Sequence, residues 1–369
     1  MKNKVNRINY LIVMRTEVVP ALFGQKHSSR DYSKAESWGK NMFNSSFPAS
    51  LVAYMYSNDI EPIYLCTNSK NEVLHKTISA DKLFGVNPLG DEAYYNYEAG
   101  FTPFEQFYTG EREKIDLVMF NRLTNTPTTG LEVKLTALPD NTTKDLNENE
   151  YSCEIVVRPP TICFLACSIC QYYNTDAKRN KLKKLLSIVP QINHWEEIAE
   201  VAPHYKKIEE AVMQVSKDMC KQQTPLMIQP VWKTQGGKMR LADDCLDVFV
   251  WSNLATIQLF CSEERTANNG ISRFQRAVIW LYRMLFDYTV YSQFDCVRII
   301  KLHSYNYAND KAFAVSGRGT HKFLTCKELT HPRIKKSEIR NIILGGGQNL
   351  LSPERRFDAV LVNSPDIFD

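Results

Sequence analysis

Three residues in the first half of the chain combine the side chains and the spacing of a hydrolytic metal site. Glu132 and Lys134 stand two apart in the segment LEVKLT, residues 131–136, in which apolar and polar residues alternate. Because strand side chains point to opposite faces in turn, the acid and the amine share one face while the apolar residues between them enter the core. Asp116 lies in the preceding β-rich segment KIDLVMF, residues 114–120. If the two strands are neighbours, Asp116 meets Glu132 across the sheet.

These groups suit the hydrolysis of a phosphodiester bond. Magnesium prefers oxygen ligands, keeps several waters and often uses only one or two carboxylates together with a phosphate. A metal ion held by Asp116 and Glu132 would polarise a phosphodiester oxygen and lower the pKa of a bound water. Lys134 would hold or deprotonate that water and offset negative charge in the transition state. The three residues therefore predict a magnesium-dependent nuclease.

The same pattern has a purely structural explanation. A half-exposed strand with an ion pair to its neighbour would also place an acid and an amine on one face, and a Glu-x-Lys triplet alone is weak evidence. The competing triplet, residues 176–178, opens a basic helix and has no partner strand. Nuclease chemistry is favoured because residues 132–134 lie in the strand with the clearest alternation.

Local patterns predict the elements that must position these residues. Helical spacing of apolar or charged residues predicts helices over residues 47–56, 94–108, 177–189, 204–221 and 272–293. Short β-rich runs predict strands at residues 60–67, 72–78, 114–120, 130–138, 153–157 and 357–362, the first two forming a hairpin. In the segment 94–108, Glu98 and Glu105 would share a helix face beside an aromatic stripe. The first half therefore supplies the strands that carry the acids, and the second half is richer in helices and loops.

At the catalytic candidates the chain resembles the PD-(D/E)xK nuclease superfamily. The matching residues are Asp116, a spacer, and Glu132-Val133-Lys134, with Ile115 in the place of the usual proline. The longer string LEVKLTALPDNTT, residues 131–143, is similar to Type II restriction endonucleases of the HindVP-like group. Three more segments support this likeness: GKNMFNSSFPASLVAYM at 39–55, YEAGFTPFEQFY at 97–108 and QPVWKT at 229–234.

The resemblance implies an α/β fold with a mixed central β-sheet flanked by helices. It implies that Asp116 and Glu132 bind Mg²⁺ and that Lys134 is the catalytic lysine. Many members add an acid from an earlier helix, a place that Glu98 or Glu105 would take, and we favour Glu98. It also implies a Type II enzyme that makes double-strand cuts in DNA at a degenerate site of the GRCGYC type, in a system with a cognate DNA methyltransferase.

Basic residues indicate where DNA would lie. A dense basic run on the helix predicted at 177–189 suits contacts with phosphates, although a solvated helix face would have the same composition. Its candidate residues are Lys178, Arg179 and Lys181. Three loops, at 232–240, 316–322 and 344–356, mix glycine with basic residues and suit base contacts in the major groove. From these loops we select Lys233, Arg240, Arg318 and Gln348.

Two other clusters have ordinary structural explanations. Cys163, Cys167 and Cys170 match the spacing of the radical-SAM iron–sulfur motif, but they share one helix face in an apolar run without a glycine-rich loop. We therefore predict that they are buried core residues. The acidic run DDCLDVFVW, residues 243–251, would allow a second metal site, but helix capping is the better prediction.

Composition is compatible with a soluble cytoplasmic enzyme that acts on DNA. The chain has 369 residues, of which 44% are hydrophobic and 23% charged, and its formal net charge is +4. A change of texture near residue 175 divides it into a nuclease core with N-terminal helices, residues 1–175, and a helical and loop-rich DNA-binding portion packed on it, residues 176–369. We expect no transmembrane helix, because no run of about 18 apolar residues occurs, and no secretion signal, because the apolar run at 11–14 is too short.

We expect a homodimer on double-stranded DNA, because a palindromic target favours a protein with twofold symmetry. Two other functions stay open. One is another PD-(D/E)xK nuclease, acting in repair or junction resolution, which would not cut plain plasmid DNA into discrete bands. The other is a non-catalytic DNA-binding protein, which would bind DNA in calcium and leave it uncut in magnesium.

Overall fold

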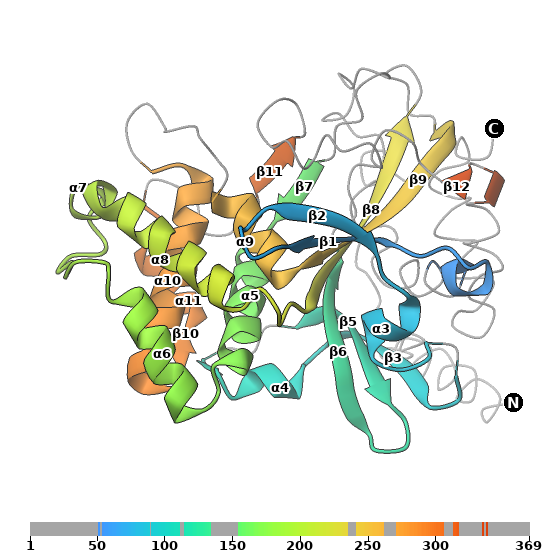
Figure 1. The fold of residues 1–369 in the computed structure, drawn as a ribbon, viewed down its shortest axis with the longest axis horizontal. Helices are drawn as coiled ribbons and strands as arrows, with labels where there is room; N and C mark the ends of the chain where they lie inside the picture. The colour runs from blue at the N-terminus through green and yellow to red at the C-terminus, as the bar shows by residue number, and fades with distance from the viewer. Residues whose placement is uncertain are drawn as a thin grey trace, which may run out of the picture.

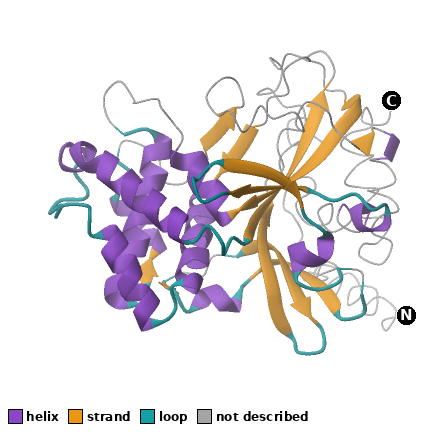
Figure 2. Cartoon of the chain, in the orientation of Figure 1, coloured by secondary structure: helices purple, strands orange, loops and turns teal. Residues whose placement is uncertain are grey.

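The computed structural model describes residues 51, 54–88, 90–110, 114–133, 154–234, 241–261, 271–305, 313–316, 334–335 and 337–338. Within them a mixed β-sheet, at the centre and right of Figure 1, stands beside a thick layer of helices on the left. Figure 2 shows the same division by colour, with most purple helices gathered on one side of the orange strands. The expected α/β class with a mixed central sheet and flanking helices is confirmed.

The main sheet is built from eight strands of the described chain. These are β1 (Ile63–Thr67), β2 (Val73–Thr77), β3 (Ala93–Ala99), β5 (Ile115–Asn121), β6 (Thr126–Val133), β8 (Pro225–Thr234), β9 (Leu241–Ser252) and β12 (Ile334–Lys335). They lie in the order β2-β1-β9-β8-β6-β5-β3, and β12 also pairs with β9. Two short pairs lie apart, β4 (Tyr108–Thr109) with β10 (Phe294–Asp295) and β7 (Glu154–Val157) with β11 (Phe313–Ser316).

The pairing directions divide the sheet into two parts that meet between β6 and β8. On one side β3, β5 and β6 form an antiparallel meander. On the other side β8 and β9 pair antiparallel over most of their length, and β1 runs parallel to β9. Because β8 runs parallel to β6, the chain must cross over between them, which requires a long connection.

Helices form that crossover and cover the sheet. Those between β6 and β8 are α5 (Pro159–Tyr172), α6 (Asp176–Leu186), α7 (Ile198–Val201), the 3-10 turn η3 (Ala202–His204) and α8 (Tyr205–Asp218). Further helices are α3 (Ala80–Phe84), α4 (Thr102–Glu105), α9 (Asn253–Cys261), α10 (Arg273–Tyr291) and α11 (Cys296–Leu302). Helices α5 and α9 contact strands of the sheet, and α10 lies against α5, α6, α8 and α9. No helix of the described residues is long and apolar enough to span a membrane.

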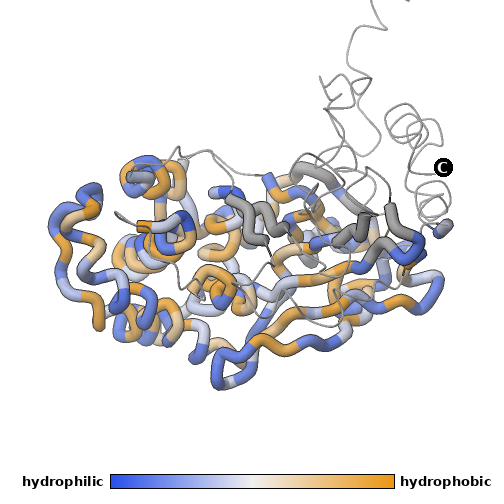
Figure 3. Tube along the Cα trace, turned by 90° about the horizontal axis from the view of Figure 1, so that it is seen from above, coloured by the Kyte–Doolittle hydropathy of each residue, from blue (hydrophilic) through white to orange (hydrophobic). Residues whose placement is uncertain are grey.

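The long helix α10 illustrates how the sequence determines these elements. Ser272 accepts a hydrogen bond from the backbone N–H of Gln275, whose side chain accepts one from the backbone N–H of Ser272. This capping box satisfies backbone donors at the start of the helix. Hydrophilic and hydrophobic residues alternate within the helices of Figure 3, as expected where one side of a helix faces the core. The helix predicted over 272–293 is confirmed as α10, and most of its side chains are buried.

The three cysteines of α5 are core residues, as predicted. Cys163, Cys167 and Cys170 are each 0% exposed and belong to the main hydrophobic cluster. Burial raises the pKa of the Cys167 and Cys170 thiols, which keeps both sulfurs protonated. Because iron–sulfur ligands are thiolates, these surroundings argue against a cluster.

The helix expected over residues 94–108 is wrong. Its first part forms strand β3, which pairs antiparallel with β5, and only the short helix α4 follows. Aromatic residues favour strands, and Gly100 and Pro103 both oppose a continuous helix. Glu98 and Glu105 therefore lie in different elements and share no helix face.

The acidic run that opens at Asp243 does not cap a helix, so this expectation is also wrong. The run lies within strand β9, where Asp243 and Asp244 are exposed and Asp247 is 1% exposed. Asp247 Oδ1 accepts a hydrogen bond from the Val248 backbone N–H at 2.7 Å. Aspartate disfavours strands, but the long pairing of β9 with β8 overrides that local preference.

Several other predicted elements are confirmed within one to three residues. The hairpin predicted at 60–67 and 72–78 is β1–β2. Also confirmed are the strands at 114–120 (β5) and 153–157 (β7) and the helices at 177–189 (α6) and 204–221 (α8). The strand predicted at 130–138 begins earlier, at Thr126, because the chain after a short turn already pairs with β5. Its continuation beyond Val133, most of the helix at 47–56 and the strand at 357–362 lie outside the described residues. Both halves of the chain contribute strands to the main sheet, and the division near residue 175 stays a prediction.

The buried thiols of α5 lead to a test of this packing. In the native protein at neutral pH, iodoacetamide should leave Cys163, Cys167 and Cys170 unmodified, because the reagent needs an accessible thiolate. The partly exposed Cys220 provides the comparison. Peptide mass spectrometry should detect all four as alkylated after denaturation, and rapid native labelling of the α5 cysteines would contradict the structure.

Candidate active site

The two carboxylate candidates, Asp116 and Glu132, lie on the neighbouring strands β5 and β6. Leu117 faces Leu131 in this antiparallel pair, so continuing the register by one residue brings Asp116 opposite Glu132. Opposite residues of antiparallel strands point to the same face, with their Cβ atoms about 5 Å apart. The expectation that these strands are neighbours is confirmed, and the continued register predicts that the two carboxyl groups share one face of the sheet.

A hydrogen bond fastens Asp116 to the partner strand. The Val133 backbone N–H donates to Asp116 Oδ2 at 2.9 Å. Val133 directly follows Glu132, so this bond anchors the carboxylate of one strand beside the acid of the next. Hydrogen bonds to ionised acceptors are stronger than neutral ones. The third catalytic candidate, Lys134, follows Val133 in the sequence and lies outside the described residues.

The strand register also brings the position of Glu98 next to that of Asp116, so the positions of the three acids form a row across β3, β5 and β6, which we call the acidic row. Glu98 takes the position opposite Asp116 in the antiparallel pairing of β3 with β5, between the pairs Tyr97–Leu117 and Ala99–Ile115. Positions 98, 116 and 132 thus follow one another across three adjacent strands. Glu105 lies instead in α4, beyond the end of β3. The register therefore favours Glu98 over Glu105 as the additional acid, although it belongs to a strand and not to the expected helix.

The two described carboxylates of the row suit a magnesium ion. Asp116 is half-buried and Glu132 is 4% exposed. Among the side chains that the structure describes, no three or more of histidine, cysteine, aspartate and glutamate gather as a metal site. Magnesium can bind through one or two carboxylates completed by water and phosphate, so the pair is sufficient.

Glycine allows close packing next to this row. Gly130 stands two residues before Glu132 on β6. A Cβ atom at that position would lie 2.9 Å from Ile115 Cδ1 and 3.1 Å from Phe101 Cγ. Both distances are too short for an ordinary contact, so a larger residue would force these neighbours away. The absent side chain lets the start of α4 pack directly against the strand that carries Glu132.

The basic run predicted to contact DNA lies on α6, but its members have different surroundings. Two of the three candidates form ion pairs, Arg179 with Asp176 at 2.8 Å and Lys181 with Asp218. The hydrogen bond to Asp218 raises the pKa of Lys181. Lys178 Nζ lies 4.2 Å from the centre of the Tyr172 ring and is exposed. Of the three, Lys178 is exposed and forms no ion pair among the described residues, so it is the best placed to contact a phosphate.

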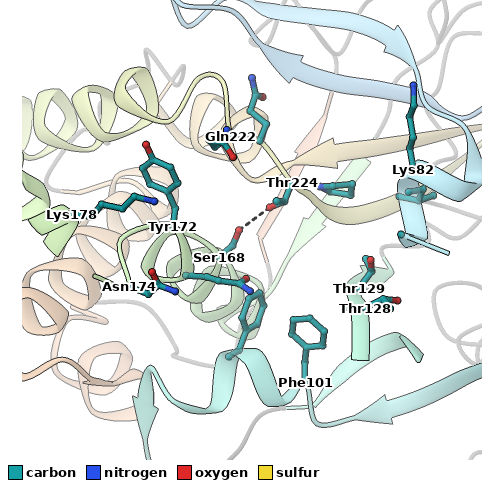
Figure 4. A pocket seen from close by; sticks show the side chains of 17 residues that line it. Lys82, Phe101, Thr128, Thr129, Ser168, Tyr172, Asn174, Lys178, Gln222 and Thr224 are labelled. Carbon is teal, nitrogen blue, oxygen red and sulfur yellow. Dashed lines mark hydrogen bonds between the residues drawn. The ribbon is translucent and has the colours of Figure 1, made fainter. Parts of the chain in front are cut away.

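A groove of about 640 Å³ opens between α6 and the first half of β6. Figure 4 shows Lys178 and Tyr172 on one side of it and Lys82, Thr128 and Thr129 on the other. At its base the hydroxyl groups of Ser168 and Thr224 are hydrogen-bonded at 3.1 Å. Two lysines and several amides and hydroxyls line it, and no carboxylate occurs among the described lining residues. The groove therefore suits an anionic ligand better than a cationic one.

The residues selected for base contacts are largely not described. Arg240, Arg318 and Gln348 lie outside the described residues. Lys233 belongs to strand β8, so the loop expected at 232–240 begins at least three residues later. The chain continues there as a strand because β8 pairs with β9 as far as Thr234.

One buried polar pair near the row was missed from the sequence. Trp251 Nε1 donates to Gln229 Oε1 at 2.7 Å, and these residues are 1% and 0% exposed. Gln229 was considered only as part of a family-like segment. A signal for it did exist, since a glutamine between apolar residues of a buried strand must find partners inside the protein.

The HindVP restriction endonuclease family model matches residues 38–368 of the chain. The chain belongs to the HindVP restriction endonuclease family. Two curated relatives match nearly end to end. The Type II restriction enzyme HgiDI of Herpetosiphon aurantiacus is 38% identical over 354 residues, covering 95% of this chain and 97% of that protein. The probable Type II restriction enzyme HindVP of Haemophilus influenzae is 39% identical over 355 residues, covering 95% and 96%. No solved structure matches significantly.

Membership of the HindVP family confirms the resemblance drawn from residues 131–143 and from the three supporting segments. The matched region extends over almost the whole chain and includes both the strands that hold the acidic row and the helical layer. The likeness is therefore not confined to a short motif.

Two variants of Asp116 separate its structural bond from its charge. Asp116→Asn retains an oxygen acceptor for Val133 N–H, so we expect a change of less than about 1 kcal/mol in the free energy of unfolding. Asp116→Ala removes the acceptor and should cost about 1–3 kcal/mol. Both should lower the single-turnover cleavage rate by ~10³-fold, because several kcal/mol of charge stabilisation are lost. Denaturant melts and single-turnover assays measure the two effects, and normal turnover by Asp116→Asn would exclude a metal-binding role.

Proposed function

We propose that the chain is a Type II restriction endonuclease that cuts both strands of DNA at a specific sequence by Mg²⁺-dependent hydrolysis. The observation that carries this proposal is the register of β5 with β6, in which Leu117 faces Leu131 and which, continued by one residue, sets Asp116 opposite Glu132. Both curated relatives are named as Type II restriction enzymes, which supports the same activity. The acidic row supplies a physical reason for it.

Each residue of the site has a distinct task in this reaction. Asp116 and Glu132, with Glu98 as the additional acid, hold the ion. Bound Mg²⁺ supplies Lewis-acid stabilisation of the phosphate and lowers the pKa of a coordinated water. Lys134 positions the attacking water and offsets the negative charge that develops on the phosphate. The bond from Val133 N–H to Asp116 keeps the acids of the two strands in a fixed relation before substrate arrives.

DNA would reach the protein through its phosphates first. We propose that Lys178 contacts the phosphates of DNA. Its exposure supports this, and so does the groove next to it, which has no carboxylate among its described lining residues. Arg179 and Lys181 contribute less because carboxylates already pair with them. Lys233, Arg240, Arg318 and Gln348 stay candidates for contacts with bases.

The cellular setting follows from the proposed activity. We propose a homodimer acting in the cytoplasm on double-stranded DNA, because twofold symmetry matches a palindromic target. A GRCGYC-type sequence is the proposed target. A cognate methyltransferase would protect the host's own copies of it.

A digest of DNA of known sequence tests the activity and the target together. With Mg²⁺ we expect discrete fragments, and run-off sequencing should place every cut at one recurring motif of the GRCGYC type. Random nicking or cleavage only at branched DNA would favour a repair or junction nuclease. A specific cut at an unrelated motif would correct the target and leave the enzyme class standing.

A variant of Lys134 tests the proposed catalytic lysine. Lys134→Ala should reduce cleavage by ~10²–10⁴-fold, the usual contribution of a positioned proton-transfer group. Binding of the same DNA in calcium should persist, as measured by fluorescence anisotropy. Unchanged turnover would remove Lys134 from the mechanism, and a wild-type protein that binds in calcium but never cuts would support a non-catalytic DNA-binding protein.

Two lysines of the same helix form a matched pair for DNA binding. Lys178→Ala should weaken DNA binding about equally for all sequences and should lower the slope of log affinity against log salt by about 1. Lys181→Ala should change that slope much less, since Asp218 already neutralises its ammonium. Salt titrations of both variants check this, and equal slopes for wild type and Lys178→Ala would show that α6 does not contact the phosphates.

A further inference from the structure

The buried pair of Gln229 and Trp251 lies in the same part of the sheet as the acidic row. Glu132 aligns with Met227 of the parallel strand β8, and Met227 aligns with Trp251 of β9. Aligned residues of neighbouring strands point to the same face, and so do residues two apart on one strand. Glu132, Trp251 and Gln229 therefore share one face, with Gln229 the diagonal neighbour of Glu132.

The indole fixes which end of the glutamine faces which neighbour. An indole N–H can only donate a hydrogen bond. The group 2.7 Å from Trp251 Nε1 must therefore be the oxygen of the Gln229 amide. The NH₂ end of that amide can only donate, and it is not used by the indole. Gln229 is 0% exposed, so its donors must be satisfied inside the protein.

Two carboxylates stand at neighbouring register positions on this face. One is Glu132 on β6, and the other is Asp247, which aligns with Val231 on the far diagonal. Asp247 Oδ1 already accepts from the Val248 backbone. Glu132 belongs to the row of acids and is itself 4% exposed. A donor aimed at a metal-binding carboxylate holds its second oxygen in place, and loss of such support typically costs 10–100-fold in metal affinity or activity.

We propose that Gln229 is a positioning residue, held by the Trp251 indole, whose amide N–H groups orient the carboxylate of Glu132 for the metal ion. The inference rests on the proposed function, since it assigns Glu132 the role of a metal ligand. It extends the site from the β5–β6 pair to β8 and β9, which lie beyond the parallel pairing of β6 with β8. Gln229 does not touch substrate in this arrangement and acts through Glu132.

Metal binding without turnover gives the first test. Mn²⁺, another divalent ion that suits oxygen ligands, can be titrated into the full-length protein and followed by electron paramagnetic resonance. The double variant Gln229→Met/Trp251→Phe removes donor and acceptor together, which avoids leaving a buried polar group without a partner. We expect it to bind Mn²⁺ about 10–100-fold more weakly than wild type. Trp251→Phe, which only releases the amide, should have a smaller effect in the same direction.

Two control variants separate positioning from general damage. Thr256→Val removes a buried hydroxyl that donates to Ser252 O at 2.8 Å in α9, away from the row. Asp247→Asn tests the other carboxylate beside Gln229. Both should leave the Mn²⁺ affinity unchanged. An equal loss in Thr256→Val, or a loss confined to Asp247→Asn, would overturn the role of Gln229 toward Glu132.

The indole resonance of Trp251 gives a readout that a merely structural role would not affect. The chain has 5 tryptophans, so in ¹⁵N-labelled protein the Trp251 signal can be assigned by its absence from Trp251→Phe. If Gln229 links the indole to Glu132, Mg²⁺ should shift this signal in wild type and not in Glu132→Ala. Wild type that binds metal and cuts DNA without such a shift, and a double variant with normal affinity, would overturn the inference alone. Wild type that binds no metal would overturn the proposed function as well.

Discussion

The pairing of β5 with β6 is the constraint on which the site depends. A shift of one residue in that register would turn every side chain of one strand to the other face, and Asp116 would no longer stand beside Glu132. The pair that precedes this position, Leu117 with Leu131, is apolar and buried on both strands. Their burial fixes the register, and the bond from Val133 N–H to Asp116 Oδ2 closes the pair at its end. Packing of the core therefore determines the relative position of Asp116 and Glu132.

The face of the sheet that carries the acids also packs against the helical layer. Along the face that carries the acids, residues such as Val118, Met227 and Trp251 belong to the main hydrophobic cluster with α5, α9 and α10. Glu132 stands on β6 next to Val133, the last residue of the strand, and aligns with Met227 of this surface. The crossover through α5 then returns the chain as β8, parallel to β6. That return is what places Gln229 within one diagonal of Glu132.

Much of the site could be predicted from the sequence because the information is local. Alternation in residues 131–136 predicted the strand, and β5 followed from a short β-rich run. Glu98 was wrongly placed in a helix, because aromatic spacing suits both structures and only the pairing with β5 decides between them. The run at Asp243 failed for the same reason, since β9 forms through its long-range partner β8. The Gln229–Trp251 bond joins residues on two strands, and no local pattern contains it.

Affinity cleavage of the polypeptide tests the central claim most directly. Fe²⁺ can replace Mg²⁺ at oxygen-ligand sites, and with ascorbate and peroxide it cuts the backbone near the place where it binds. The account predicts cuts close to residues 98, 116 and 132 in the same sample, suppressed by excess Mg²⁺ and lost in Glu132→Ala. Cuts confined to another part of the chain, such as the acidic run at Asp243, would show that the divalent ion does not bind between β5 and β6.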